Sequence, residues 1–507
     1  MNKAFFLFVL LFPFCVPAQF TGQQKPNIIL IYTDDLGYGD LSCYGAIKLT
    51  TPNLDKLAQQ GIRFTHAHST SATCTPSRYA LMTGQYPWRK EGTNILPGDA
   101  LLIIPENTFT LPRMMQKAGY KTAIVGKWHL GLGNTLEKDW NSEIKPSPNE
   151  VGFDYSFIFP ATADRVPTVF VENHKVIGLD ISDPIHVDYK QKTGTEPTGK
   201  ENPELLKMKA SHGHDNTIVN GIGRIGFMSG GKTTRWTDEE VPYTFLLKAK
   251  QFIEENLPDR QAGTRKPFFL YYPMTEPHVP RMPATMFKGK SGLGARGDVI
   301  LQLDWVVGEI MKHLKLLGIE KNTILIFTSD NGPVLDDGYH DEAVEKLNGH
   351  TPAGVLRGGK YSIFEGGNRV PFIVSWPRMI KPGVSDAMIS QIDLFASFAK
   401  LTKQQIKKGN APDSYDVLGA LMGRSKEGRD LLIEHANGLA IVQNNWKYIE
   451  PNNGRAYNPA TATELGNSPD PQLYDLRNDP GEKNNLAPRY PEKIKALAAL
   501  LNKAKEK

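Results

Sequence analysis

The sequence lacks three features that would mark a nucleic-acid-binding, membrane-spanning or repetitive protein. Its 59 basic and 54 acidic residues are spread along 507 positions without a long block of one sign, and the net charge is only +5. So small and diffuse a charge excludes nucleic-acid binding driven by electrostatics. The most apolar run, residues 4–16, is too short to span a bilayer, and no internal repeat is visible. The composition, 40% hydrophobic and 22% charged, is that of a folded soluble protein of two or three domains.

The N-terminus has the layout of a secretory signal. Lys3 provides a short basic region, the apolar run of residues 4–16 follows, and Ala18 is the small residue that suits signal-peptidase cleavage. Residues 1–18 therefore predict a signal peptide and an exported protein, periplasmic or secreted, with no transmembrane segment.

Cysteine is scarce, with only 3 in the chain. Cys15 is the residue that a lipoprotein anchor would use, but the bulky Phe14 before it does not suit that processing, so a lipid anchor is the less favoured alternative. Removal of the signal leaves Cys43 and Cys74, and two cysteines in an exported protein would by default form a disulfide. The segment around Cys74, described below, argues against that pairing.

Four short apolar runs predict buried parallel strands, and each run ends in polar residues. Continuous apolar stretches of this length are expected where a strand is covered on both faces. The runs are residues 27–32, 122–125, 267–272 and 323–327, and the polar residues after them are Thr33-Asp34-Asp35, Gly126-Lys127-Trp128-His129, Thr275-Glu276-Pro277-His278 and Thr328-Ser329-Asp330-Asn331-Gly332.

Helical patterns lie between these strands, at residues 53–60, 111–118 and 302–317, and a glycine follows each of them. Alternating strands and helices predict an α/β fold with a large, mostly parallel, doubly wound sheet. The ligand crevice of such a sheet lies outside the carboxyl ends of its strands. We therefore expect the four polar clusters to meet in one crevice.

The character of the sequence changes near residue 425. Short strands at residues 431–434, 440–442 and 446–449 predict a small antiparallel sheet, and the Lys- and Ala-rich residues 491–507 predict a helix that closes it. We expect a large N-terminal domain over residues 19–424 and a smaller C-terminal subdomain over residues 425–507.

Residues 160–245 are rich in Gly, Thr, Lys and His but show no clear periodicity. They predict long loops over the crevice, where substrate recognition usually lies. His212 and His214 fall in this region, and two loop histidines without further ligands are expected to be surface residues rather than a second metal site.

The densest signal surrounds Cys74, in a segment that reads Ser-Ala-Thr-Cys-Thr-Pro-Ser-Arg-Tyr-Ala-Leu-Met-Thr-Gly over residues 71–84. Pro76 suits the first turn of a helix that ends near Gly84, which places Cys74 at the helix N-terminus and Arg78 one turn further in. This arrangement predicts an anion site. A cysteine standing alone there would be an ordinary buried residue.

The sequence Cys-x-Pro-Ser-Arg followed by Leu-x-Thr-Gly resembles the signature of the formylglycine-dependent sulfatases, which share the alkaline phosphatase-like fold. Exported bacterial carbohydrate sulfatases are the most similar members, and the resemblance extends through most of the mature chain. The other matching segments are Asp34-Asp35, Gly126-Lys127-Trp128-His129-Leu130-Gly131, His278, Asp330-Asn331-Gly332, Gly359-Lys360, Leu473-Tyr474-Asp475-Leu476 and Asp479-Pro480.

In that family a maturation enzyme oxidises the cysteine to formylglycine (3-oxoalanine), whose hydrate supplies the attacking oxygen. The resemblance therefore implies conversion of Cys74 and a sulfatase-maturation enzyme as a partner, and it leaves no sulfur at position 74 to pair with Cys43. It also implies Ca²⁺, with Mg²⁺ as the alternative, held by hard oxygen donors. The implied ligands are Asp34, Asp35, Asp330, Asn331 and the converted residue 74.

The resemblance also implies the remaining catalytic roles. Arg78 and Lys127 would hold the hydrate and the sulfate, while Lys360 and His278 approach the sulfate from the opposite side. One hydrate oxygen attacks sulfur and expels the sugar alcohol, and the other hydroxyl then collapses the covalent sulfate ester. His129 is the implied base for the collapse. Either His278 or Lys360 is the acid for the departing alcohol, and that choice stays open.

The expected activity is hydrolysis of a carbohydrate sulfate monoester, with a galactose or N-acetylgalactosamine sulfate as the first guess. The hydrophobic membrane hairpins of steroid-sulfate enzymes are absent from the sequence. Two alternatives remain, a one-metal phosphonate or phosphodiester hydrolase that uses the same modified cysteine, and a non-catalytic glycan-binding protein. The predicted sugar contacts are Asp164, Arg165, Asn173, His174 and Arg357.

Overall fold

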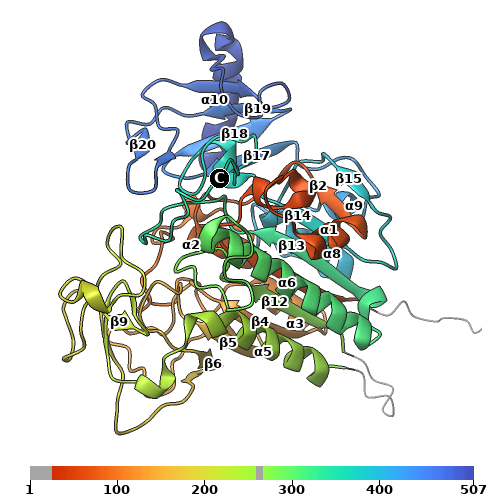
Figure 1. Ribbon diagram of the computed structural model, residues 1–507. Helices are drawn as coiled ribbons and strands as arrows, with labels where there is room; N and C mark the ends of the chain where they lie inside the picture. The colour runs from red at the N-terminus through yellow and green to blue at the C-terminus, as the bar shows by residue number, and fades with distance from the viewer. Residues whose placement is uncertain (1–24, 258–265, 507) are drawn as a thin grey trace, which may run out of the picture.

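The computed structural model describes residues 25–257 and 266–506, and a mixed ten-stranded sheet lies at its centre (Figure 1). The five strands from β13 to β5 in this sheet are parallel, while β14 and β2 at one side and β6 and β7 at the other add antiparallel pairs. The predicted large, mostly parallel sheet is thus confirmed. In order across the sheet the strands are β15 (Gly383–Ser385), β2 (Ile62–Phe64), β14 (Phe372–Ser375), β13 (Thr323–Ser329), β1 (Asn27–Thr33), β12 (Phe268–Pro273), β4 (Lys121–Lys127), β5 (Tyr155–Phe159), β6 (Val171–Glu172) and β7 (Lys175–Val176).

Helices cover both faces of the sheet, and strand β1 shows how the sequence is divided between them. Successive side chains of a strand point to opposite faces, so Ile28 and Tyr32 pack against one layer of helices while Ile29 and Ile31 pack against the other. The first layer contains α2 (Cys74–Thr83), α3 (Leu111–Lys117) and α8 (Leu394–Thr402), and the second contains α1 (Pro52–Gln59), α5 (Val241–Glu255) and α6 (Gly294–Leu316).

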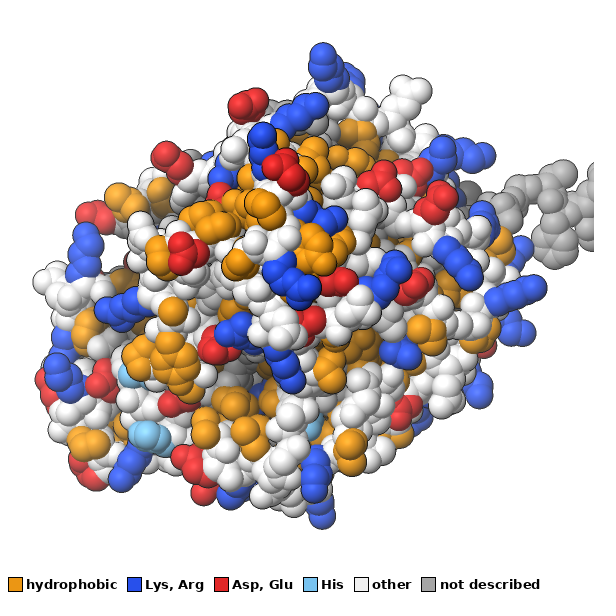
Figure 2. All heavy atoms as spheres, turned by 90° about the horizontal axis from the view of Figure 1, so that it is seen from above, with side chains coloured by type: hydrophobic (Ala, Val, Ile, Leu, Met, Phe, Trp, Pro, Cys, Tyr) orange, Lys and Arg blue, Asp and Glu red, His pale blue; other side chains and the backbone are white. Residues whose placement is uncertain are grey.

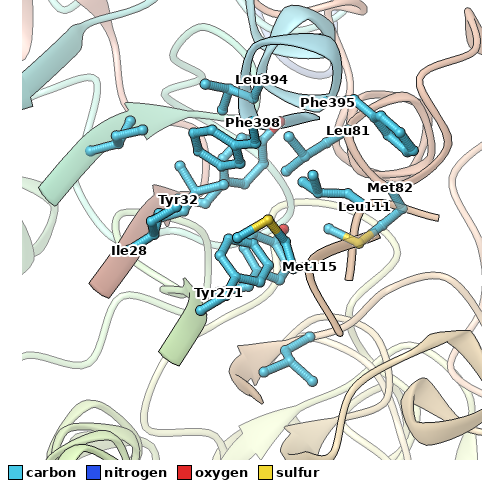
Figure 3. Close-up of a cluster of buried hydrophobic side chains, with 14 of the residues drawn as sticks. Ile28, Tyr32, Leu81, Met82, Leu111, Met115, Tyr271, Leu394, Phe395 and Phe398 are labelled. Atoms are coloured by element: carbon cyan, nitrogen blue, oxygen red, sulfur yellow. The ribbon is translucent and has the colours of Figure 1, made fainter. Parts of the chain in front are cut away.

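The first of these layers is drawn in Figure 3. Leu81 and Met82 of α2 lie beside Phe395 and Phe398 of α8, next to the strand residue Tyr32. Each such side chain contributes about 1.5–3 kcal/mol when it is fully removed from water. This apolar layer fixes α2, and therefore its N-terminal residue, against the sheet.

A smaller antiparallel sheet forms at the C-terminal end, seen in blue at the top of Figure 1. Helix α10 (Pro491–Lys505) packs on it through the buried Leu497 and Leu501. Three of its strands and the helix match the prediction, and the fourth strand comes from a later segment. The division at residue 425 itself stays a prediction. The strands are β17 (Leu431–His435), β18 (Leu439–Gln443), β19 (Trp446–Ile449) and β22 (Gln472–Asp475).

Residues 160–240 form the predicted loop region, with short strands and turns but no α-helix. Its strands beyond the main sheet are β8 (His186–Asp188), β9 (Ile218–Val219), β10 (Ile222–Gly223) and β11 (Phe227–Ser229). Helix α5, which begins at Val241, and strand β5 before the region were not predicted.

The predicted signal, residues 1–18, lies outside the described residues. Over residues 25–257 and 266–506, no helix combines the length and the apolar character needed to cross a membrane. In the same residues Cys43 and Cys74 are both free. On the face seen in Figure 2, basic and acidic side chains are interspersed, in line with the diffuse charge of the sequence.

Candidate active site

The candidate site lies at the carboxyl ends of the parallel strands β13, β1 and β4, with β12 between β1 and β4 in the sheet. Thr33 of β1 pairs with Ser329 of β13 in the sheet, so the residues that follow them, Asp34-Asp35 and Asp330-Asn331, leave the sheet side by side. Lys127 is the last residue of β4. All five of these polar side chains are at most 1% exposed, which is unusual for charged groups unless they are paired or bind an ion.

Cys74 is the first residue of α2, as predicted, and it is buried. The helix ends at Gly84, whose φ of 66° suits glycine and closes the last turn. The free N–H groups of the first turn and the helix dipole favour negative charge beside Cys74. Burial raises the pKa of the Cys74 thiol, so an unmodified cysteine here would be a protonated thiol and a poor nucleophile.

Each carboxylate of the site has a cation beside it. The Arg78 Nη2 donates to Asp330 Oδ2 at 2.7 Å, and Lys127 Nζ donates to Asp34 Oδ2 at 2.5 Å. Lys360 Nζ donates to Asp35 Oδ2 at 2.9 Å and to Asp337 Oδ2 at 2.7 Å. These contacts join residues from five distant parts of the chain into one network.

The three central carboxylates repel one another despite these cations. Burial and the negative charge of Asp34 raise the pKa of Asp330 to about 7. Burial would also raise the pKa of Asp34, but Lys127, His278 and Arg78 outweigh it and lower that pKa. The site therefore needs further positive charge for all its carboxylates to be ionised at neutral pH.

The oxygen atoms of the site suit a hard divalent cation. Asp34 Oδ1 and Asn331 Oδ1 are buried and have no hydrogen-bond partner among the described residues. Asn331 Nδ2 donates to Asp35 Oδ1 at 2.7 Å, which fixes the amide so that its oxygen is free. Ligand atoms of Asp34, Asp35 and His278 lie within 4.8 Å of one another. Carboxylate and amide oxygens are the donors that Ca²⁺ prefers, so the predicted metal ligands fit the ion.

His129, two residues after the end of strand β4, has one ring nitrogen without a hydrogen-bond partner in the described residues. Its Nε2–H donates to the backbone oxygen of Leu96 at 2.9 Å, and its Nδ1 is buried without a partner in the described residues. Burial and the neighbouring Lys127 lower the pKa of His129 well below its usual value. The ring is therefore neutral at neutral pH, and Nδ1 can accept a proton.

His278 has the opposite tautomer. Its Nδ1–H donates to the backbone oxygen of Val279 at 2.7 Å, which leaves Nε2 facing the site, 3.8 Å from Asp35 Oδ2 and 4.0 Å from Asp337 Oδ2. Burial lowers the pKa of His278, although Asp34 partly opposes the effect. Neither carboxylate is close enough to hold Nε2, so this nitrogen is available to a substrate.

A cavity of about 160 Å³ opens in front of Cys74. A volume of this size suits a small polar group such as a sulfate together with part of a sugar ring, and charged or polar groups make up most of its wall. Its lining residues are Cys74, Ile95, Asp164, Arg165, His214, His278, Asp337, Lys360 and Tyr361.

Asp164 and Arg165, two of the predicted sugar contacts, lie in this wall. Arg165 Nη1 donates to both oxygens of Asp164 at 3.0 Å, and His214 Nε2 contacts Asp164 Oδ2 at 2.9 Å. The prediction that His214 is a surface residue was wrong, because it is only 7% exposed and faces the cavity. Burial would lower the pKa of His214, but Asp164 outweighs it and raises that pKa, so the ring can donate from both nitrogens.

The other three predicted sugar contacts lie elsewhere, and none lines the cavity in the described part of the chain. Asn173 turns the chain between β6 and β7 with a φ of 55°, and its Oδ1 accepts from the backbone of β5. His174 pairs with Glu150 at 3.0 Å. Arg357 pairs with Glu464 at 2.7 Å and lies over the ring of Phe364. The structure does not bring these three residues to the cavity in front of Cys74, and in the described residues their polar groups stabilise loops.

Sequence reasoning missed four residues of the cavity wall, Ile95, His214, Asp337 and Tyr361. Asp337 follows the Asp330-Asn331 segment by a few residues, and Tyr361 directly follows Lys360. Tyr361 donates to Asp337 Oδ1 at 3.1 Å. Proximity to a predicted site residue was the available signal for both, whereas the sequence gives no sign that Ile95 or His214 reaches the cavity.

The fold and the site together define a hydrolase with the alkaline phosphatase-like architecture, in which a helix N-terminus, an oxygen-rich cluster and three buried cations surround the reacting group. Within this class the chain belongs to the sulfatase family, whose model matches residues 26–404. Sulfatases are sulfuric ester hydrolases, and the protein is therefore an enzyme of that kind.

Several known proteins similar to the chain are sulfatases. It is 55% identical over 485 residues to an N-acetylgalactosamine-6-O-sulfatase of Bacteroides thetaiotaomicron, an alignment that covers 95% of this chain and 94% of that enzyme. It is 31% identical over 504 residues to arylsulfatase A of Homo sapiens, covering 94% of this chain and 87% of the relative. A solved structure from work on glycosaminoglycan metabolism by Bacteroides thetaiotaomicron superposes with a TM-score of 0.93 at 55% identity, covering 96% of this chain and 100% of that one.

Proposed function

We propose that this enzyme removes the 6-sulfate from N-acetylgalactosamine in a sulfated glycan. The observation that carries the proposal is the 55% identity, over 95% of the chain, to an enzyme named for that reaction. The cavity agrees with it, because a wall of Asp164, Arg165, His214 and Tyr361 offers donors and acceptors to sugar hydroxyls beside the residues that surround Cys74.

A screen of sulfated sugars tests the proposal. We expect sulfate release from N-acetylgalactosamine 6-sulfate to exceed release from the 4-sulfate isomer and from galactose 6-sulfate by at least about tenfold in kcat/KM, the effect of one well-made hydrogen bond to a charged group. Ion chromatography of the released sulfate gives the rates. Preference for another sulfated sugar would contradict the proposed substrate but leave the assignment as a sulfatase unchanged.

The screen should also contain a phosphonate monoester and a phosphodiester. A phosphonate monoester hydrolase of Agrobacterium radiobacter shares the fold, with a TM-score of 0.55 at 16% identity, a likeness that speaks for the fold alone. Faster cleavage of either phosphorus ester would overturn the sulfatase proposal for the natural substrate. Glycan binding without release of any anion, from protein with unmodified Cys74, would instead identify a binding protein.

Two groups supply chemistry that the side chains alone lack. A formylglycine at position 74 supplies a hydrated aldehyde, an oxygen nucleophile on a residue that begins as a cysteine. A Ca²⁺ held by Asp34, Asp35, Asp330 and Asn331 supplies positive charge for a sulfate oxygen and for that nucleophile, with Mg²⁺ as the alternative.

The chain's own residues position and neutralise the reacting groups. The first turn of α2 holds residue 74 at the cavity and directs its N–H groups toward negative charge. Lys127 Nζ donates to Asp34 and Lys360 Nζ donates to Asp35, and these two cations supply positive charge for a sulfate. His129 Nδ1 is free to accept the proton from the residue-74 hydroxyl, and Arg78 keeps Asp330 in place.

We assign the acid for the departing sugar alcohol to His278 in its cationic form, in which both ring nitrogens carry a proton and which the negative charge of a bound sulfate ester would stabilise. Its Nε2 faces the cavity without a close partner, whereas Lys360 Nζ is held by two carboxylates at 2.9 and 2.7 Å. Burial would lower the pKa of Lys360, but Asp337 and Asp35 outweigh it and raise that pKa well above its usual value. A lysine held this firmly keeps its proton and serves as a fixed charge.

Metal removal tests the cation assignment. We expect dialysis against a calcium chelator to lower kcat by at least about 100-fold, the size of effect seen when one strong electrostatic group is lost from an active site. Restored calcium should recover the rate, measured as sulfate release before and after the addition. Full activity in protein shown by elemental analysis to be free of divalent metal would contradict the assignment.

The contact of His214 with Asp164 provides a test of substrate binding. We expect His214→Gln to raise KM for the sugar sulfate by about three- to tenfold, as for one hydrogen bond, with little change in kcat. The matched control is His212→Gln, since the His212 side chain is 39% exposed and does not line the cavity in the described residues. Equal effects of the two substitutions would remove His214 from the binding site.

Export and maturation complete the proposal. The layout of residues 1–18 supports cleavage after Ala18 and release to the periplasm or the medium, with a lipid anchor as the less favoured outcome. The Cys-x-Pro-Ser-Arg segment supports recognition by a sulfatase-maturation enzyme. The intact mass of the active enzyme reports both events, since the mature chain should begin at Gln19 and should lack the sulfur of Cys74.

A further inference from the structure

A second cluster of ligand-type side chains lies outside the candidate active site, where the main sheet meets the C-terminal sheet. His66 precedes strand β3 (Ala67–His68) and His68 ends it, and Glu365 begins the short helix α7 (Glu365–Asn368). Alternate residues of an extended chain share one face, so both histidines point the same way. One ligand atom of each of the three residues lies within 4.8 Å of the others.

The two histidines carry nitrogen atoms that nothing in the described chain satisfies. The side chains are buried, at 7% exposure for His66 and 0% for His68, and the Nε2 atom of each has no hydrogen-bond partner among the described residues. Their ring centroids are 5.0 Å apart. Buried polar atoms are nearly always paired, so two unpaired nitrogens in one cluster indicate a bound group between them.

A carboxylate fixes the tautomer of His68. Glu434 Oε1 lies 2.7 Å from His68 Nδ1, and neither group is exposed. The contact places the ring proton on Nδ1 and leaves the Nε2 lone pair directed into the cluster. A histidine that binds a metal through one nitrogen commonly donates from the other to such a carboxylate.

The balance of charged side chains around the cluster is compatible with a bound cation. Three buried glutamates surround Lys447, with Glu434 at 2.7 Å, Glu365 at 3.0 Å and Glu482 at 3.2 Å. Arg369 is the second cation nearby, 3.3 Å from Glu365. In the described residues two positive groups therefore face three ionisable carboxylates, so a divalent ion does not meet an excess of positive charge.

We propose that His66 Nε2, His68 Nε2 and a carboxylate oxygen of Glu365 bind a divalent transition-metal ion, and that this ion is Zn²⁺. Two imidazoles and one carboxylate are a donor set typical of zinc, whereas the oxygen-rich set around Asp34 suits calcium. The cluster is closed to solvent, which assigns the ion a structural role.

Such an ion would brace the segment that leads to the nucleophile. The chain runs from His68 to Cys74, and on the way Ala72 N donates to the backbone oxygen of His435 at 2.9 Å. The ion would join this segment to α7 directly and to β17 through Glu434. It therefore connects the segment that leads to Cys74 with α7 and with the C-terminal sheet.

Metal titration of the full-length enzyme tests the site. The metal-stripped protein, kept in excess calcium to fill the site at Asp34, is titrated with cobalt chloride. We expect one equivalent of Co²⁺ to bind and to show the visible absorption of a low-coordinate ion with nitrogen and oxygen ligands. Zinc chloride should displace this Co²⁺, and bound Zn²⁺ should raise the Tm of the protein. No cobalt bound under these conditions would overturn the proposal.

Substitution of His66 identifies the ligands. His66→Phe keeps a ring of similar size and removes both nitrogens. The Nε2 atom of His66 has no hydrogen-bond partner in the described residues, so its removal breaks no hydrogen bond there. We expect this variant to lose the equivalent of Co²⁺ and the Zn²⁺-dependent rise in Tm while its far-ultraviolet spectrum is unchanged. His186→Phe, at an exposed residue of β8, is the control that keeps both signals. Unchanged cobalt binding in His66→Phe would sink the proposal, and His66→Gln decides the matter if the phenylalanine variant does not fold.

Glu434 should act as a positioning residue rather than a ligand. Glu434→Gln is expected to weaken Zn²⁺ binding by about 10- to 100-fold, as for other carboxylates that orient a metal-bound histidine, without abolishing the cobalt spectrum. Unaltered affinity in this variant would contradict the orientation of His68 that the site requires. None of these experiments measures sulfate release. The proposed metal site can therefore be refuted without refuting the sulfatase reaction, and the reverse also holds.

Discussion

Cys74→Ala is expected to lower kcat for the sugar sulfate by a factor on the order of 10⁶, which is the cost of losing the nucleophile of a covalent mechanism. The fold should remain, because residue 74 is a small buried residue at the start of α2 and alanine is compatible with a helix. Sulfate release gives the rate, and thermal unfolding followed by circular dichroism gives the stability.

The matched control is Cys43→Ala. Cys43 is the other free cysteine in the described residues and is only partly buried, so its loss should leave kcat unchanged. Equal inactivation of both variants would point to a disulfide or a shared structural role rather than a nucleophile. Retained activity in Cys74→Ala would exclude residue 74 from the chemistry.

Mass spectrometry of the peptide that contains residue 74 separates two explanations of an inactive variant. In fully active enzyme this peptide should lack the sulfur of cysteine and carry an aldehyde oxygen in its place. An intact thiol in fully active material would contradict the conversion. The buried, protonated thiol that the structure indicates could not then be the nucleophile without another activating group.

The strand-end residues of the site could be predicted from the sequence because parallel strands impose their arrangement. Asp34 and Asp330 each follow a continuous apolar run, and two parallel strands in register bring their carboxyl ends together. Cys74 was placed for a similar local reason, since Pro76 and Gly84 mark the two ends of one helix. Local signals sufficed for these residues.

The loop residues of the site could not be predicted in this way. His214 reaches the cavity only because residues 160–240 fold back over the sheet, where Asp164 accepts its Nε2–H. Asn173 and Asp164 are equally polar and close in sequence, but one turns a hairpin and the other lines the cavity. No periodic pattern distinguishes them, because loop conformation depends on contacts with distant segments.

Some helix and strand boundaries could not be predicted correctly, for related reasons. The predicted helix at residues 302–317 covers only the later part of α6, which begins at Gly294 and ends at Leu316. The first turn contains two glycines, Gly294 and Gly297, and their low helix propensity gives no sequence signal for the start of the helix. Strand β22 joins the C-terminal sheet from residues well beyond β19, and such long-range pairing leaves no local signal.

His278→Ala is expected to produce a loss that depends on the leaving group. A sugar alcohol departs as a strongly basic oxygen and needs a proton, whereas 4-nitrophenol leaves as a stable anion. We therefore expect kcat/KM for the sugar sulfate to fall by about 10²- to 10⁴-fold, the usual contribution of a general acid. The loss for 4-nitrophenyl sulfate should stay below about tenfold.

Lys360→Ala provides the contrast. Lys360 Nζ bridges Asp35 and Asp337 at 2.9 and 2.7 Å, so its removal leaves two buried carboxylates without their cation, a change that costs about 3–5 kcal/mol when one partner of a buried pair is lost. Both substrates should lose rate to a similar extent, because the fixed charge of Lys360 acts on the sulfate group that both substrates share. Parallel measurements of kcat/KM on the two sulfates distinguish these patterns.

The two variants together decide which residue protonates the alcohol. If Lys360→Ala shows the leaving-group dependence and His278→Ala does not, the acid is Lys360 and the free Nε2 of His278 only contacts the sulfate. If both variants lose equally on both substrates, the proton comes from elsewhere in the cavity wall. The leaving-group dependence expected of His278 follows from its geometry, since its Nδ1–H is held by Val279 and its Nε2 alone faces the cavity.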